Sequence, residues 1–243
     1  MASASSRFHT TLWSVVRQAG DAANEERRRA LETLCVTYWQ PLYSWCRRDG
    51  KSEDEAQELV QGLFARLLDS ESLTNLDPAR GRFRGWLLAA LKNHVVNERE
   101  HARAERRGGG RPPLPIDVRA AERTWSEEPA AEARPDDVFD RDWARTLTRG
   151  VLADLQRDEI ARGRGEVFDA LESWLAAPPP AGALERIADG LGMRKSAIKV
   201  ALHRLRRRFS EGVRTRIAQT VAAPEDVEEE LRTLIGALAE KTG

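Results

Sequence analysis

Apolar residues recur at helical spacing along almost the whole chain. In the segment that begins at Glu25 they fall at positions i, i+3, i+4 and i+7, on one face of a helix; they are Leu31, Leu34, Cys35 and Tyr38. Pro41 either interrupts this helix or starts another turn, and apolar residues continue up to a stop at Gly50. No run of alternating or β-branched residues competes as a strand, so the pattern predicts an all-α protein.

Start and stop signals indicate three further helices in the N-terminal half. A short amphipathic helix is expected over residues 11–20. Ser52 stands at an N-cap position before three acidic residues, which favours a helix from there to about Leu68. Another helix is expected from near Phe83 to about Arg103.

The composition changes at residues 108–135, which hold three consecutive glycines and a Pro-Pro-Leu-Pro run. This composition is typical of a flexible linker, so two helical domains joined by a linker are expected, the C-terminal one with a helix-turn-helix. The predicted segments are a helical domain at 1–106, the linker at 107–135, a second helical domain at 136–222 and an acidic C-terminal helix at 223–243.

The helical pattern resumes at Asp136 and continues almost to the C-terminus. Helices are expected from Asp136, over 165–175, 184–191 and 195–221, and from Pro224. The last of them carries an apolar stripe, which would pack within the protein or bind a partner; it consists of Val227, Leu231, Leu234, Ile235 and Leu238.

Composition narrows the class of protein. With 41% hydrophobic and 32% charged residues, the 243-residue chain is too apolar for disorder throughout and too charged for a membrane-spanning protein. Two cysteines, Cys35 and Cys46, are too few for a disulfide framework. Together with the lack of a signal-peptide pattern at the N-terminus, they indicate the reducing cytoplasm.

The formal net charge of zero conceals a segregation of charge along the chain. Residues 80–111 carry a net +6 and residues 184–216 a net +7, whereas residues 122–142 carry −5 and residues 224–243 carry −4. A polyanion meets a local surface and not a sum, so the neutral total does not exclude a nucleic-acid partner.

The second basic block fits the register of a helix-turn-helix over residues 184–203. Gly192 stands where the turn needs a positive φ, and apolar or small residues fill the slots where two helices cross; these are Ile187, Ala188, Leu191, Ile198 and Ala201. The opposite side would enter the major groove of DNA, where basic side chains pair with guanine; it consists of Arg194, Lys195, Ser196, Lys199, Val200 and His203. The residues after His203 carry a high density of positive charge, which is suited to contact with DNA phosphates; they are Arg204, Arg206, Arg207 and Arg208. The alternative is an ordinary antiparallel helix pair with a basic exposed face.

Two separated motif sets resemble the extracytoplasmic-function (ECF) group of bacterial sigma factors, in the sigma-70 class. Residues 186–188, 191–193 and 197–206 are similar to region four of that group, which binds the −35 promoter element. Residues 54–64 resemble region 2.2, the helix that docks on the clamp helices of the polymerase beta-prime subunit. Residues 83–87, followed by Lys92-Asn93, resemble regions 2.3 and 2.4, which open the −10 element and hold a flipped base.

The resemblance implies two further sets of site residues. Docking on the polymerase would use polar side chains, because Leu59, Leu63 and Phe64 are expected in the core; the set is Asp54, Gln57, Glu58 and Gln61. Contact with the −10 element would use aromatic, amide and basic side chains; the set is Phe83, Arg84, Trp86, Lys92, Asn93, Asn97 and Arg99. Of the two aromatic residues, Trp86 is expected to be buried and Phe83 to stack on a base.

The resemblance also implies a non-enzymatic cytoplasmic protein without a cofactor. Its partners would be promoter DNA and core RNA polymerase, through the beta-prime clamp helices and the beta flap. Regulation by an anti-sigma factor is common in the group, although no residue here points to one. The chain departs from the group at Arg194, where a serine or threonine is usual, at Asn97, where an aspartate is frequent, and at Glu100, which adds a negative charge.

Three other interpretations fit parts of the sequence. The chain could be a helix-turn-helix regulator that binds DNA without polymerase, or an interaction protein whose acidic linker and tail mask its basic helices. His94, Glu98 and His101 fall on one predicted helix face, but no fourth ligand accompanies them, so a metal site is not expected.

Overall fold

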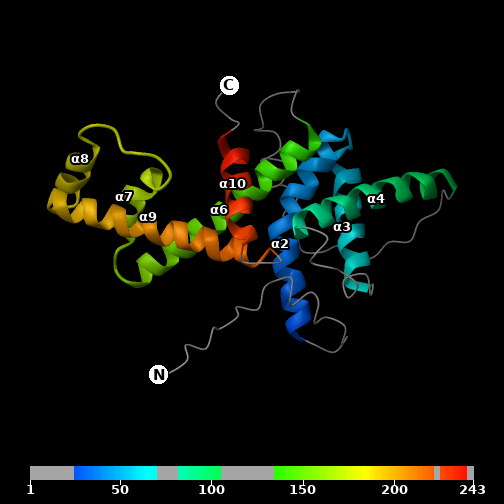
Figure 1. Cartoon of the computed structure of the whole chain (residues 1–243), viewed down its shortest axis with the longest axis horizontal. Helices are drawn as coiled ribbons and strands as arrows, with labels where there is room; N and C mark the ends of the chain where they lie inside the picture. Colours follow the sequence, from blue (N-terminus) through cyan, green and yellow to red (C-terminus); the bar gives the residue numbers. More distant parts are fainter. Residues whose placement is uncertain (1–24, 70–81, 105–133, 222–224, 240–243) are drawn as a thin grey trace. The chain divides into compact units, whose positions relative to one another are not determined.

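The computed structural model describes residues 25–69, 82–104, 134–221 and 225–239 (Figure 1). Within these ranges every regular element is a helix, which confirms the predicted all-α class. The elements are α2 (Glu25–Arg48), α3 (Glu53–Asp69), α4 (Phe83–Ala104), α6 (Pro135–Ala161), α7 (Gly165–Leu171), the 3-10 turn η3 (Glu172–Trp174), α8 (Ala183–Gly190), α9 (Lys195–Ala218) and α10 (Asp226–Ala239). None of these helices is long and apolar enough to cross a membrane.

Most predicted helix limits agree with the observed ones. The cap at Ser52 is confirmed, because the Glu55 backbone N–H donates to Ser52 Oγ at 3.3 Å and the Ser52 N–H donates back to Glu55 Oε2 at 2.8 Å. The segment predicted as one helix over 165–175 is instead α7 followed by η3. The helix predicted over residues 11–20 and nearly all of the predicted linker lie outside the described residues.

Pro41 neither ends nor restarts a helix, because it lies inside α2, a single helix of 24 residues. Proline removes one backbone N–H and crowds the preceding turn, so the neighbouring packing must hold the helix together. Large side chains on both sides of Pro41 are buried and supply that packing; they are Tyr38, Trp39, Leu42 and Tyr43.

The chain forms two compact units, and their limits differ from the predicted segments. The first unit comprises the described parts of Met1–Thr146 and Ile217–Gly243, and the second comprises Leu147–Arg216. The start of α6 therefore belongs with α2, α3 and α4, where it buries Val138, Phe139 and Trp143. α10, predicted as a separate tail, belongs to the same unit.

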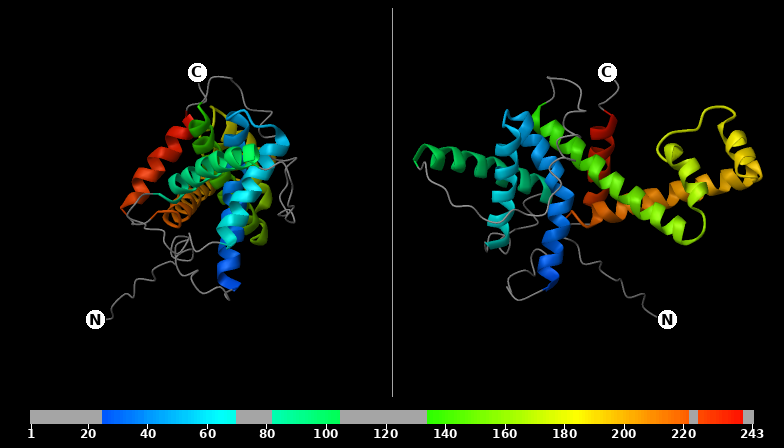
Figure 2. Two further views of the ribbon diagram at one scale, coloured as in Figure 1. Left: turned by 90° about the vertical axis from the view of Figure 1, so that its right-hand side faces the viewer. Right: turned by 180° about the vertical axis from the view of Figure 1, so that it is seen from behind.

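In the first unit α2 packs along α3, and α4 packs across α3 (Figures 1 and 2). The α3–α4 contact is close at Gly62, where a Cβ would lie 2.9 Å from Nε2 of the buried His94. The apolar face of α4 turns into this core through Leu87, Leu91 and Val95.

In the second unit α7, α8 and α9 pack on the second half of α6. The core they form consists of Leu155, Phe168, Leu171, Leu175, Ala188, Ile198, Ala201, Leu202 and Leu205. Gly192 has φ +61° in the turn between α8 and α9, as its place in the sequence predicts. Burial of Ile198 and Ala201 confirms the inward side predicted for α9.

Candidate nucleic-acid interface

The first turn of α4 places Phe83 in the core and Trp86 nearer the surface. Phe83 is 3% exposed and its ring lies 5.4 Å from that of Tyr38, in an edge-on contact. Trp86 is half-buried, with its ring 5.7 Å from that of Phe83. The expectation that Phe83 stacks on a base while Trp86 is buried is therefore wrong, because the core aromatic cluster takes the Phe83 ring and leaves the Trp86 ring partly accessible.

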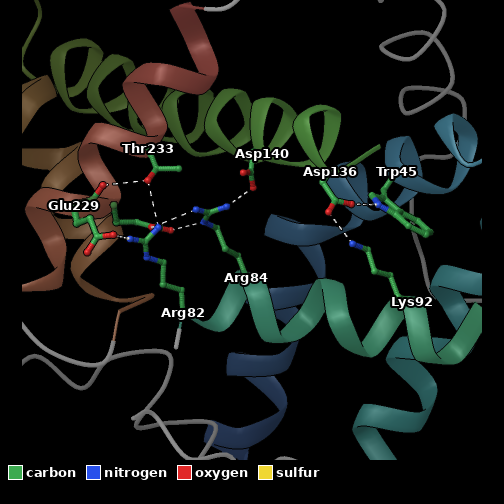
Figure 3. Close-up of polar contacts among 9 residues, drawn as sticks. Trp45, Arg82, Arg84, Lys92, Asp136, Asp140, Glu229 and Thr233 are labelled. Atoms are coloured by element: carbon green, nitrogen blue, oxygen red, sulfur yellow. Dashed lines mark hydrogen bonds and ion pairs between the residues drawn. The ribbon is translucent and has the colours of Figure 1, made fainter. Parts of the chain in front are cut away.

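Arg84, expected on the DNA-facing side, is buried among acidic partners (Figure 3). Its Nε donates to Glu230 Oε1 of α10 at 2.5 Å, and Nη1 pairs with Asp140 of α6. The guanidinium also lies over the Trp143 ring, 4.9 Å from the centroid. Burial opposes the charge, but the hydrogen bond and charge of Glu230, with those of Asp140, raise the pKa of Arg84 above its ordinary value.

Arg82, just before α4, joins the same cluster, and the sequence analysis missed it. Its guanidinium pairs with Glu229, lies 2.9 Å from Glu230 Oε2, and donates to Thr233 Oγ1 at 3.3 Å. The only sequence signal was a basic residue next to the predicted start of a helix. Its partners lie 147 or more positions further along the chain, so spacing could not reveal them.

Lys92, two turns further along α4, is held by the first turn of α6 (Figure 3). Its ammonium group lies 2.7 Å from Asp136 Oδ2 and 5.8 Å from the centroid of the Trp45 ring. Trp45 Nε1 donates to the other Asp136 oxygen at 2.9 Å. Desolvation raises the pKa of Asp136, but these two hydrogen bonds outweigh it and the pKa falls below its usual value.

A different side of α4 is exposed, and it is polar and small rather than basic. Asn93 and Asn97 lie on it with Gly85 and Ala89, and Val96 beside them is half exposed. Amide side chains can hydrogen-bond the edges of unstacked bases. The side chain of Arg99 lies outside the described residues.

The polar residues of α3 predicted to dock on polymerase differ in exposure. Asp54 and Glu58 are exposed, whereas Gln57 and Gln61 are half-buried. Leu63 and Phe64 are buried as expected. The Gln61 Nε2 atom is buried and has no hydrogen-bond partner within the described part of the chain.

α10 packs on a face that only partly coincides with the predicted apolar stripe, because Leu234 is buried and Val227 and Leu231 are half-buried. The helix buries Glu230, Leu234 and Ala237, whereas Ile235 and Leu238 of the stripe remain 57% and 37% exposed. Of the two alternatives for the stripe, packing within the protein holds at Leu234 and does not hold at these two residues. The helix is turned so that the Glu230 carboxylate meets Arg82 and Arg84, which apolar periodicity cannot reveal.

In the second unit, the side of α9 that is expected to face the DNA groove is exposed to solvent. All six residues predicted on it are exposed; they are Arg194, Lys195, Ser196, Lys199, Val200 and His203. Lys195 pairs with Glu185 of α8, which ties the first turn of α9 to the preceding helix. The Arg194 carbonyl accepts the first bonds of α9, from Ala197 N–H at 2.9 Å and Ile198 N–H at 3.2 Å.

The arginine run after this surface is mostly occupied within its own unit. Arg208 pairs with Asp158 and Glu159, and Arg204 lies 3.7 Å from Glu159. Arg206 instead donates to the backbone carbonyls of Trp174 and Ala177. Arg207 has the most exposed side chain of the run, at 70%, and lies 3.4 Å from Glu211. The expectation that all four arginines serve phosphates is therefore wrong for Arg206, whose bonds close the loop after η3.

His94, the centre of the possible metal set, is enclosed. It is 5% exposed, its Nδ1 lies 3.2 Å from Arg66 Nη1, and burial lowers its pKa. Among the described residues no group of three metal-ligating side chains forms.

The family match found by comparison with known proteins lies in the first unit. Residues 35–107 match the family model for Sigma-70 region 2. These residues are therefore similar to region 2 of the sigma-70 family. Neither a curated protein nor a solved structure gives a match to the chain.

The region 2 match covers both sets of N-terminal site residues. It includes all of α3 and α4 and the part of α2 from Cys35 on, and so the predicted polymerase-docking and −10 residues. The acidic partners of Arg82, Arg84 and Lys92 come from α6 and α10, which lie outside the matched residues.

Proposed function

We propose that this chain is a sigma factor of the ECF group, which binds core RNA polymerase in the cytoplasm and directs promoter recognition and the start of transcription. The observation that carries the proposal is the region 2 match over the helices that bear both N-terminal motif sets. Region 2 combines polymerase binding with promoter melting, and neither task requires a catalytic residue or a cofactor.

The described surfaces support a division of labour between the two units. In the first unit the exposed acids Asp54 and Glu58 of α3 are available to the beta-prime clamp helices, and Asn93 and Asn97 of α4 to unstacked bases of the −10 strand. In the second unit, Arg194 and Lys199 of α9 lie on an exposed face suited to the major groove of a −35 element. Contacts with the beta flap and with an anti-sigma factor complete the proposed set of partners.

A second candidate, a helix-turn-helix regulator that acts without polymerase, draws its support from α9. A positive-φ glycine before a helix with an exposed basic face is what such a regulator also needs. That candidate leaves the region 2 match without a role.

One experiment separates the two candidates. The purified chain is mixed with bacterial core RNA polymerase and genomic fragments, and run-off transcripts are recorded with and without the chain. A sigma factor co-purifies with core and yields discrete transcripts only in its presence, while the chain alone binds double-stranded DNA weakly. Robust sequence-specific binding by the chain alone, with no core binding, would favour the regulator. The double variant Asp54→Asn/Glu58→Gln should weaken core binding. Each single variant is compared with Glu211→Gln in α9, which removes one exposed charge away from α3 and should leave core binding unchanged.

A further inference from the structure

The basic side chains of α4 and of the residue before it are all engaged by acids from elsewhere in the chain, within residues 82–98. Arg82 and Arg84 pair with Glu229 and Glu230, Arg84 also pairs with Asp140, and Lys92 pairs with Asp136 (Figure 3). These contacts bring the two acidic blocks of the sequence onto its first basic block.

The carboxylates differ in depth, and the difference defines an inner and an outer layer. The Glu230 side chain is 2% exposed and touches both arginines, so it forms the inner layer. The Glu229 side chain is 61% exposed and touches Arg82 alone, which is itself 27% exposed. The Glu229 side of this contact is exposed and contributes little to folding stability, so it can be exchanged at small cost. Full release of Arg82 also requires its contact with Glu230, at 2.9 Å, to break.

A carboxylate and a backbone phosphate use the same geometry at a guanidinium group, since both offer paired anionic oxygens to its N–H donors. The partners that Arg82 and Arg84 take within the chain therefore occupy the positions that phosphates of a nucleic acid would take.

We propose that α10 is an intramolecular competitor of single-stranded DNA, which holds Arg82 and Arg84 in a closed state through Glu229 and Glu230. In the open state α10 releases its acids, and the two arginines bind backbone phosphates of the same strand whose bases meet Asn93 and Asn97 further along α4. Arg82 is thereby a DNA-binding residue. The inference rests on the proposed function, because that function makes α4 the surface that meets the −10 strand.

The competition differs from the masking expected from the charge blocks alone. By size of charge, an acidic tail would pair with the +7 block at residues 184–216. The described contacts of Glu229 and Glu230 are instead with the +6 block, at two arginines that flank the buried Phe83. The closed state is therefore specific to the proposed melting surface.

The test measures affinity of the full chain for a fluorescein-labelled 20-nucleotide oligodeoxythymidine by anisotropy. Glu229→Gln/Glu230→Gln should bind the probe about 5-fold more tightly than the parent, because more of the chain is in the competent state. The matched control is Glu225→Gln/Asp226→Asn, which likewise removes two charges, at the start of α10, and should leave the affinity near that of the parent. Circular dichroism melts check that each variant is folded.

A double-mutant comparison assigns the gain to Arg82 and not to the basic face of α9. In an Arg82→Ala background, the two glutamine substitutions should raise affinity by less than about 2-fold. If Glu230→Gln prevents folding, Glu229→Gln alone should still give a gain of about 2-fold that depends on Arg82. Equal affinities of folded parent and variant, or a gain of the same size without Arg82, would overturn the proposal.

Hydrogen exchange measures release of α10 directly, independently of any change in the net charge of the protein. Addition of saturating oligodeoxythymidine should speed amide exchange over residues 226–239 in the parent, and unchanged exchange there contradicts release of α10. Failure of the sigma-factor proposal is seen separately, as the absence of core binding and run-off transcripts from the parent.

Discussion

At the scale of single residues, Gly62 shows how tightly the proposed polymerase-docking helix is joined to the proposed melting helix. A Cβ at this position would lie 2.9 Å from Nε2 of His94. His94 is 5% exposed and contacts Arg66, so its ring has little room to move away. The close approach of α3 to α4 thus requires a residue without a side chain.

Gly62→Ala should lower the free energy of unfolding by about 1 to 2 kcal/mol, because the cost of overpacking exceeds the helix propensity gained. Gly85→Ala in α4 is the control, since a Cβ there meets nothing within 4 Å. That variant should be as stable as the parent or more stable by up to about 1 kcal/mol. Urea denaturation measures both, and equal stabilities of Gly62→Ala and the parent would show that His94 moves aside freely.

Residue-level prediction worked where the determinant is local. Ser52 caps α3 and Gly192 adopts a positive φ because each property depends on the residue and its nearest neighbours. It did not reveal the environment of Arg84, because the acids that bury this residue are 56 and 146 positions away. A basic residue in a DNA-binding motif has the same sequence whether it meets a phosphate or a carboxylate of its own chain.

At the scale of elements, Glu159 organises the second unit. The side chain at the end of α6 is 1% exposed and accepts two hydrogen bonds from Arg164, at 2.6 and 3.0 Å. Arg208 of α9 also pairs with it, and Arg204 lies nearby. The hydrogen bond from Arg164 is the main reason that the pKa of Glu159 is below its usual value. One carboxylate therefore ties α6, the turn before α7 and α9 together.

Glu159→Gln should destabilise the second unit by about 3 kcal/mol, because it leaves several guanidinium groups around a neutral side chain. Asp154→Asn removes an acid of α6 that pairs with Arg157 and Arg216 but is 48% exposed, so its cost should be about 1 kcal/mol or less. Hydrogen exchange over residues 147–216 reports the stability of this unit in the full chain. Similar effects of the two substitutions would contradict the central role of Glu159.

Elements were predicted well where burial follows periodicity. α9 turns Ile198 and Ala201 inward and its basic side outward because apolar burial sets the orientation of the helix. The same rule holds only in part for α10, which buries Leu234 together with the ion-paired Glu230 and leaves Ile235 exposed. Pro41 inside α2 is the same lesson for a helix breaker, since tertiary packing outweighs the local preference.

At the scale of the whole molecule, acids from two distant blocks of the sequence meet basic residues of a third block inside one unit. Asp136 and Asp140 come from the acidic block before and within α6, and Glu229 and Glu230 from the block at the C-terminus. Segregated blocks could be recognised in the sequence, but their pairing could not, because opposite blocks attract one another in any order. The surface of α9 keeps its basic side chains exposed, so the two proposed DNA contacts differ in how they are regulated.

This difference predicts that the two units can be disabled separately. Arg194→Ala/Lys199→Ala removes two exposed basic side chains of α9, and each lost base contact should cost about 1 to 3 kcal/mol of discrimination at the upstream promoter element. Binding to core RNA polymerase should be unchanged, because the proposed docking residues lie on α3. Run-off transcription from promoters altered at either element, together with co-purification on immobilised core, measures the two effects. The variant with Glu229→Gln/Glu230→Gln should do the reverse, keeping the upstream preference while gaining affinity for the single strand. Loss of core binding in the α9 variant would mean that one surface serves both tasks and would refute the division of labour.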